Sequence, residues 1–154
     1  MRQARIIVFL CGLTISAVAI GVEHLDANTQ KTAAVLAELS QKSGLPEADL
    51  NDLLADCHAN QQSMYFCAWR DQIAADKKLR RALTEKKQKI PACKNFLESK
   101  TAAWIRFRDQ SCDKSTRKEW GEGSMRPTAR AICVTKETAR MTKRLERIHT
   151  CTPS

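Results

Sequence analysis

Apolar residues along most of this chain recur three or four positions apart with polar residues between them, which is typical of amphipathic α-helices. The pattern predicts a first helix over residues 30–42, where Ala and Leu, strong helix formers, are frequent. A second helix is expected after Pro46, because proline fits the first turn of a helix. A third is expected from Asn60 to about Lys87. The alternation typical of strands is absent, so the predicted fold class is all-α.

Two further amphipathic stretches complete a predicted small bundle of four to five helices. Pro91 opens the first of them, and Thr135 is expected to cap the second. Between them, residues 112–134 or thereabouts contain two glycines and Pro127, which predict one long loop. A loop of that length is usually functional or mobile. The apolar stripes predict these core anchors: Leu79, Phe96, Trp104, Phe107 and Leu145.

The N-terminal segment has the layout of a secretory signal peptide. Arg2 and Arg5 precede an apolar run that ends in small residues suited to cleavage. The predicted signal covers residues 1–19, with cleavage as late as residue 27 left open. The apolar run is about 15 residues, shorter than the roughly 20 of a transmembrane helix, and an uncleaved anchor is the alternative. We therefore expect one periplasmic or secreted domain over residues 28–154.

Export changes what the cysteines indicate. Downstream of Cys11 the chain has six cysteines: Cys57, Cys67, Cys93, Cys112, Cys133 and Cys151. An even number in a short exported chain predicts a disulfide framework, for which six cysteines allow 15 pairings. When two segments run antiparallel, the residue numbers of each facing pair add up to nearly the same value. The numbers 93 and 151 add up to 244, and 112 and 133 add up to 245. This arithmetic favours the following pairs: Cys93–Cys151, Cys112–Cys133 and, as the remainder, Cys57–Cys67.

The chain is basic, with a formal net charge of +9, or +7 without Arg2 and Arg5. Net charge informs about association with partners and not about the fold. Basic side chains gather in the segment 77–89: Lys77, Lys78, Arg80, Arg81, Lys86, Lys87 and Lys89. This basic segment is either a solvated helix face or a contact for anionic polymers or lipid surfaces. Nucleic acid is disfavoured as a partner, because no aromatic residues interleave with these charges.

No pattern of residues predicts an enzyme. The three histidines lie far apart, no Cys-x-x-Cys occurs and no glycine-rich loop follows a strand, so no metal, cofactor or phosphate site is expected. Ser124 follows Gly123, but it lacks the two flanking glycines of a nucleophile elbow. If the six downstream cysteines are paired, they leave no thiol for nucleophilic catalysis.

A series of spaced motifs covers roughly residues 57 to 146. They are Cys57 with Cys67, Ala75-Asp76-x-x-Leu79, Ala103-Trp104-Ile105-x-Phe107-Arg108-Asp109-x-x-Cys112, Gly123-Ser124, Cys133 and Thr138. On these motifs the chain resembles the lysozyme-inhibitor LprI-like family of exported bacterial proteins. The Trp-Ile-x-Phe-Arg-Asp-x-x-Cys run followed by Gly-Ser is the most specific part. The resemblance implies a small, mostly helical envelope protein and, for some members, inhibition of lysozyme.

The chain also departs from the pattern of that family. The departures are Arg80 in place of Asn, Leu83 in place of Tyr, Thr101 in place of Gln, Glu122 in place of Gly, and Arg140 one place from the expected arginine. Cys93 and Cys151 are additions to the usual cysteine set. These changes leave the helical frame intact and weaken the case for a shared polar site.

Inhibition of lysozyme sets a chemical requirement, because that enzyme has two carboxylates flanking the scissile bond. A loop tied at its base would present hydrogen-bond donors to such a cleft at a low ordering cost. The residues expected to contact a partner are Gly123, Ser124, Arg126 and Arg108. Common lysozymes are themselves basic, however, so a chain near +7 meets them with repulsion. The main hypothesis is an envelope protein-binding module that inhibits lysozyme or another cell-wall hydrolase; the alternative is a binder of anionic polymers or lipid surfaces.

Overall fold

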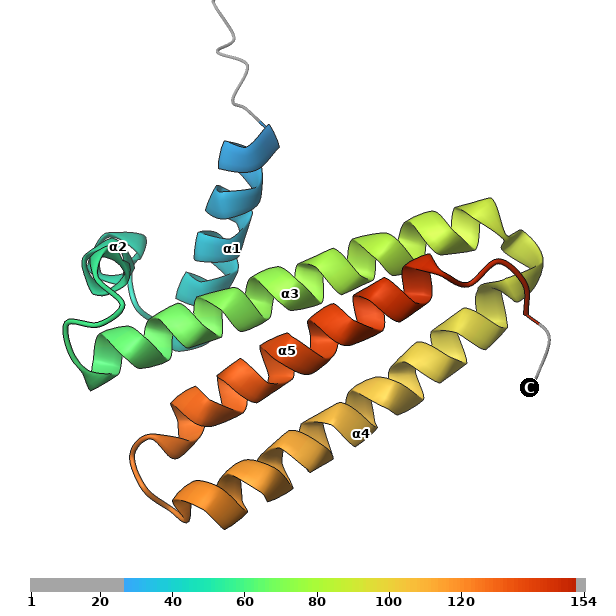
Figure 1. Cartoon of the computed structure of the whole chain (residues 1–154). Helices are drawn as coiled ribbons and strands as arrows, with labels where there is room; N and C mark the ends of the chain where they lie inside the picture. The colour runs from blue at the N-terminus through green and yellow to red at the C-terminus, as the bar shows by residue number, and fades with distance from the viewer. Residues whose placement is uncertain (1–26, 152–154) are drawn as a thin grey trace, which may run out of the picture.

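The computed structural model describes residues 27–151, which form α-helices joined by short connections and contain no strand (Figure 1). In chain order the helices are α1 (Ala27–Ser43), α2 (Glu47–Ala55), α3 (Gln61–Lys89), the short 3-10 helix η1 (Pro91–Cys93), α4 (Lys94–Trp120) and α5 (Arg126–Glu146). The all-α prediction is confirmed. The predicted signal peptide and Cys11 lie outside the described residues. No helix in the described part of the chain is long and apolar enough to cross a membrane.

The predicted long loop over residues 112–134 is wrong. Helix α4 continues to Trp120 and α5 begins at Arg126, so only residues 121–125 connect them. Pro127 lies in the first turn of α5, where its missing N–H costs no hydrogen bond. Thr135 likewise lies inside α5, where its hydroxyl donates to the carbonyl oxygen of Ala131 instead of capping a helix.

The three long helices lie side by side, with α5 between α3 and α4 (Figure 1). Helices α3 and α5 run in the same direction, and α4 runs antiparallel to both. Helix α2 packs on the N-terminal part of α3, and α1 packs along α3 as far as Arg80. Among the described helices, α5 is therefore the central one of the layer, and it packs most extensively against α3.

Two apolar clusters form the core. The first joins α1, α2 and α3 through Val35, Leu39, Leu50, Phe66 and Ile73. The second joins α3, η1, α4 and α5 through Leu79, Cys93, Leu97 and Leu145. Because these clusters sit at different places along α3, that helix is the element common to both halves of the protein.

The predicted core anchors divide into three groups. Leu79 and Leu145 are buried, whereas Phe96 and Trp104 are half-buried at the edge of the second cluster. Phe107 is wrong as a core anchor, because its side chain is 67% exposed. Arg108 is the residue that faces inward on this turn of α4. Because successive side chains are about 100° apart around a helix, Phe107 then faces outward.

Threonines and small residues line the buried face of α5. The buried residues are Thr128, Ala131, Val134, Thr138, Thr142 and Leu145. The hydroxyl of Thr138 donates to the carbonyl oxygen of Val134 at 2.7 Å, and that of Thr142 donates to the carbonyl oxygen of Thr138 at 2.9 Å. These bonds within the helix satisfy the buried hydroxyl groups of Thr138 and Thr142, whereas the buried Thr128 hydroxyl has no hydrogen-bond partner among the described residues.

Three disulfides connect the helices. Cys57–Cys67 ties the α2–α3 connection to α3, Cys93–Cys151 ties the end of the chain to η1, and Cys112–Cys133 joins α4 to α5. Their Cα–Cα distances are 5.7, 5.5 and 5.7 Å, in the ordinary range for a disulfide. These pairs are the ones that the residue-number sums favour. The α4–α5 hairpin therefore carries a covalent cross-link in addition to its packing.

The three disulfides should differ in their contribution to stability, because the closed loops span 10, 58 and 21 residues. Chain entropy predicts losses of about 4 kcal/mol for Cys93→Ala/Cys151→Ala, about 3 kcal/mol for Cys112→Ala/Cys133→Ala, and somewhat less for Cys57→Ala/Cys67→Ala. Urea denaturation of the three double variants measures these losses. The reverse order of stability would contradict the loop-closure explanation.

Candidate functional site

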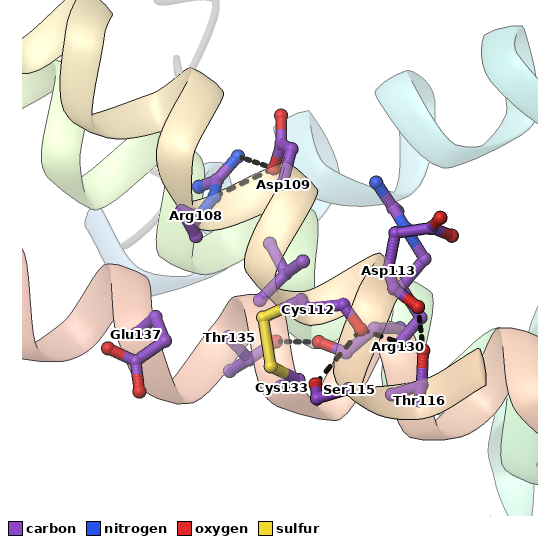
Figure 2. Close-up of a disulfide and its surroundings, with 12 residues drawn as sticks. Arg108, Asp109, Cys112, Asp113, Ser115, Thr116, Arg130, Cys133, Thr135 and Glu137 are labelled. Atoms are coloured by element: carbon purple, nitrogen blue, oxygen red, sulfur yellow. Dashed lines mark hydrogen bonds and ion pairs between the residues drawn. A yellow bond between two sulfur atoms is a disulfide. The ribbon is translucent and has the colours of Figure 1, made fainter. Parts of the chain in front are cut away.

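The residues that carry the most specific sequence motif meet in a polar cluster between three helices. The Arg108 guanidinium on α4 donates to Asp76 Oδ1 on α3 and to Thr138 Oγ1 on α5, each at 2.6 Å. It also donates through Nε to Asp109 Oδ1 at 2.9 Å (Figure 2). The guanidinium carbon lies 5.5 Å from the centre of the Trp104 ring. We call these residues the Arg108 cluster.

The prediction that Arg108 contacts a partner does not fit its position. Only 5% of the Arg108 side chain is exposed, and its donors are taken up by Asp76, Asp109 and Thr138 of the same protein. An arginine has five N–H donors in a fixed fork, so it can bond groups from several elements at once. Arg108 therefore sets the relative position of α3, α4 and α5, and it supports the neighbouring α4–α5 hairpin from inside.

The connection between α4 and α5 is a tight turn, which we call the α4–α5 turn (residues 121–125). Gly121 has φ 57° and ψ −132°, and the Gly123 N–H donates to the Trp120 carbonyl oxygen at 3.0 Å. These dihedral angles match the first central position of a type II′ turn, which favours glycine. A Cβ added to Gly123 would lie 2.9 Å from the Trp120 carbonyl oxygen, so glycine is required there as well.

Arg126 braces this turn from the first residue of α5. Its Nη2 lies 2.8 Å from Asp113 Oδ1 on α4, and its Nη1 pairs with Glu122 in the turn. The hydrogen bond from Arg126 lowers the pKa of Asp113, and the same bond raises the pKa of Arg126. Only 16% of the Arg126 side chain is exposed. The guanidinium is thus occupied with internal partners, and its role is to fix the turn.

Ser124 is the exposed polar residue of the predicted set. Its hydroxyl donates weakly to Gln61 Oε1 at 3.3 Å, which brings the turn next to the start of α3. Two surface hollows adjoin it. One, of about 310 Å³, is lined by Glu122, Gly123, Ser124, Arg126, Pro127 and Arg130. The other, of about 540 Å³, is lined by Gln61, Gln62, Tyr65, Ser124 and Pro127. Gly123, Ser124 and Arg126 therefore lie together at one end of the protein, and Arg108 does not lie with them.

The Cys112–Cys133 disulfide stands between the turn and the Arg108 cluster. Figure 2 shows the sulfur bridge linking α4 and α5, with Arg108 and Asp109 one helical turn away along α4. The Thr116 hydroxyl donates to the Cys112 carbonyl oxygen at 2.7 Å on the other side. The end of the hairpin is thus held by a covalent bond, by ion pairs at Asp113 and by buried hydrogen bonds.

The basic segment is partly neutralised by neighbouring groups. Lys77 Nζ and Arg80 Nη2 lie 2.8 and 3.4 Å from Glu38 Oε2 on α1. Lys87 Nζ lies 2.6 Å from Glu98 Oε1, which lowers the pKa of that carboxyl. Lys86 Nζ donates to the backbone carbonyl oxygens of Glu146 and Ile148, both at 2.9 Å. These contacts weaken the alternative in which the segment binds anionic polymers, because several of its charges serve the fold.

Sequence reasoning missed residues that the tertiary structure brings to this end of the protein. Asp113 and Gln61 contact Arg126 and Ser124, yet they lie 13 and 63 positions away in the chain. Such pairs leave no local signal in a single sequence. The sequence does contain one signal for Trp120. It directly precedes Gly121 at the end of α4 and is not one of the buried residues of that helix, which indicates an exposed tryptophan. Within residues 27–151, no group of three or more His, Cys, Asp or Glu residues could hold a metal ion.

Comparison with known families identifies a matching family. The family model described as lysozyme inhibitor LprI matches residues 55–145, which is more than half of the chain. The matched region contains all of α3 and α4, most of α5, the Arg108 cluster and the α4–α5 turn. Helix α1, with Glu38, lies outside it. No curated protein and no solved structure matches the chain.

Removing the Arg108 guanidinium should destabilise the bundle strongly. Arg108→Met leaves Asp76 and Thr138 without their donor inside the fold, and we expect a loss of about 2–4 kcal/mol in the free energy of unfolding. Arg106→Met, on the exposed side of the same helix, should change it by less than about 0.5 kcal/mol. Urea denaturation measures both. Equal, small effects of the two substitutions would show that the Arg108 cluster does not hold the helices.

Glu38 should make stability depend on pH below neutrality. The hydrogen bond from Lys77, with further support from Lys42, lowers the pKa of Glu38 from its ordinary 4.5 to about 2. Because the folded-state pKa is the lower one, the contribution is complete above about pH 4.5 and is lost as the pH falls towards 2.

The measurement is the difference in unfolding free energy between the unmodified protein and Glu38→Gln. At pH 7 we expect Glu38 to contribute about 1–2 kcal/mol after allowance for solvent screening, and at pH 2 this difference should be small. Glu85→Gln, at an exposed position of α3, is the matched control. A Glu38→Gln effect that stayed constant from pH 7 to pH 2 would contradict this assignment.

Proposed function

The chain belongs to the lysozyme inhibitor LprI family, and on that premise we propose that it binds and inhibits a lysozyme-like cell-wall hydrolase in the bacterial envelope. The observation that carries the proposal is the family match together with its extent, because it covers α3, α4 and most of α5, and so includes the α4–α5 hairpin. Three disulfides suit an oxidising compartment, either the periplasm or the exterior of the cell. The protein acts as a binding module and not as an enzyme.

The contact surface that we propose is the end of the α4–α5 hairpin. Beyond the Cys112–Cys133 bridge, about two turns of α4 extend roughly 12 Å before Gly121. A hairpin end of this kind is narrow and is already fixed before it meets a partner. Binding therefore orders few groups, which lowers the entropic cost of entering a cleft.

Donors at this end suit the carboxylates of a glycosidase cleft. The Ser124 hydroxyl is exposed on the turn and gives up only a long hydrogen bond to Gln61 when it binds elsewhere. The positive end of the α5 dipole lies beside it, and Met125 makes no side-chain capping bond with any described residue. Gly123 lets the chain pass close to a partner surface, since it carries no side chain. Arg126 acts indirectly, as the residue that positions the turn through Asp113 and Glu122.

The alternative function, binding of anionic polymers or lipid surfaces through residues 77–89, has less support. Glu38, Glu98 and the last carbonyl oxygens of the α5 region take up charges of this segment. The family match also points to a protein partner and not to a polymer. We therefore propose inhibition of a hydrolase through protein–protein contact as the function.

The test measures lysis of a cell-wall suspension by a purified c-type lysozyme at increasing concentrations of the protein. The unmodified protein should inhibit, and Arg126→Ala should raise the half-inhibitory concentration about 5- to 50-fold, because the turn loses its brace. Ser124→Ala should raise it by a smaller factor. Arg144→Ala, at an exposed position near the end of α5, is the matched control and should have no effect.

Absence of inhibition by the unmodified protein at micromolar concentration would rule out lysozyme as the partner. Equal loss of inhibition in Arg126→Ala and Arg144→Ala would instead place the contact away from the turn. Thermal unfolding of each variant confirms that the folded protein is what is compared.

A further inference from the structure

A groove with exposed apolar side chains runs between α4 and α5 beside the turn. It has a volume of about 370 Å³ and lies over the Cys112–Cys133 bridge, since Cys133 forms part of its wall. The lining residues are Ser115, Thr116, Glu119, Trp120, Ala129, Ile132, Cys133, Lys136, Glu137 and Arg140. We call this the Trp120 groove. None of its residues belongs to the set expected from sequence to bind a partner.

The Trp120 groove contains two of the large apolar side chains that the described chain exposes. Trp120 is 42% exposed and Ile132 is 43% exposed, and both line the same hollow. Phe107 is more exposed still, but it does not line this groove. Neighbouring exposed apolar side chains favour association, and tryptophan is enriched among the residues that dominate binding energy.

The charges around the groove cancel, unlike those of the protein as a whole. Glu119 and Glu137 stand against Lys136 and Arg140, of which Arg140 pairs with Glu137. The whole chain carries +9, and the surface where α1 meets α3 is lined by Lys31, Lys77, Arg80 and Arg81. A basic enzyme such as lysozyme is therefore repelled by the α1–α3 side and meets no net charge at the Trp120 groove.

The groove is also continuous with the α4–α5 turn. Trp120 is the last residue of α4, and its carbonyl oxygen accepts the hydrogen bond that closes the turn. Thr116 anchors the groove wall from below through its bond to the Cys112 carbonyl oxygen. A partner that receives the turn in a cleft thus brings the edge of that cleft against the groove.

We propose that Trp120 and Ile132 form the apolar anchor of the interface with the hydrolase, and that the groove receives an apolar side chain from the rim of the enzyme's cleft. This inference rests on the proposed function. It adds a second contact to the interface, in which apolar side chains are buried, beside the hydrogen bonds that the turn makes. Contact at a locally neutral, apolar surface also explains how a basic inhibitor binds a basic enzyme, because the attraction there does not depend on opposite charge.

The experiment compares Trp120→Ser and Ile132→Ser with Phe107→Ser, a matched change at an exposed apolar residue outside the groove. Inhibition of a purified c-type lysozyme is measured for each, with thermal unfolding and size-exclusion chromatography as controls. Trp120→Ser should raise the half-inhibitory concentration at least tenfold and Ile132→Ser several-fold, while Phe107→Ser stays within twofold. All three should unfold at nearly the unmodified temperature, since each side chain is exposed.

Two outcomes would overturn the inference and leave the proposed function intact, and a third would overturn both. If the unmodified protein inhibits and Trp120→Ser inhibits equally well, the groove is not part of the interface. If the unmodified protein forms a dimer that Trp120→Ser abolishes without loss of inhibition, the groove binds a second copy instead. If the unmodified protein does not inhibit and does not co-elute with the lysozyme, the proposed function fails and the groove's assignment to that partner fails with it.

Discussion

The Arg108 guanidinium is a buried group that joins all three long helices by directional bonds. Apolar packing between these helices buries residues such as Val134 and Leu145, but apolar contact is not directional. Arg108 adds directional bonds from α4 to Asp76 on α3 and to Thr138 on α5. One helical turn farther along α4, Cys112 adds a covalent bond to Cys133. Together these two contacts fix the hairpin whose end forms the candidate site.

Rigidity at the end of the hairpin connects the fold with the proposed function. Asp113 and Glu122 hold Arg126, and Arg126 holds the turn, so the donors at Ser124 and at the start of α5 are in place before binding. A larger, mobile loop would lose more conformational entropy on entering a cleft. The helical hairpin therefore suits tight binding better than the long loop that the glycines and Pro127 had suggested. The neutral Trp120 groove beside it offers an apolar surface for a partner to bury, and this contact does not depend on the overall positive charge.

The errors in the predicted fold have specific physical causes. Proline ends helices but also begins them, and Pro127 does the latter because the first turn of α5 needs no N–H at that position. The exchange of Phe107 and Arg108 follows from the Arg108 cluster: a buried arginine is stable only where carboxylates and hydroxyls from other helices meet it. Neither Asp76 nor Thr138 is a neighbour of Arg108 in the sequence.

The sequence by itself determined the helical class and most helix starts, and the residue-number sums of the cysteines favoured the pairs that the structure contains. These features depend on local propensity and on constraints that act along the chain. The tertiary structure alone decided that Arg108 lies inside, that Arg126 is held by Asp113, and that Trp120 and Ile132 share a groove. Each of these depends on the angle and register at which α4 meets α5 and α3. That geometry arises from contacts between residues far apart in the chain, for which a single sequence contains no local pattern.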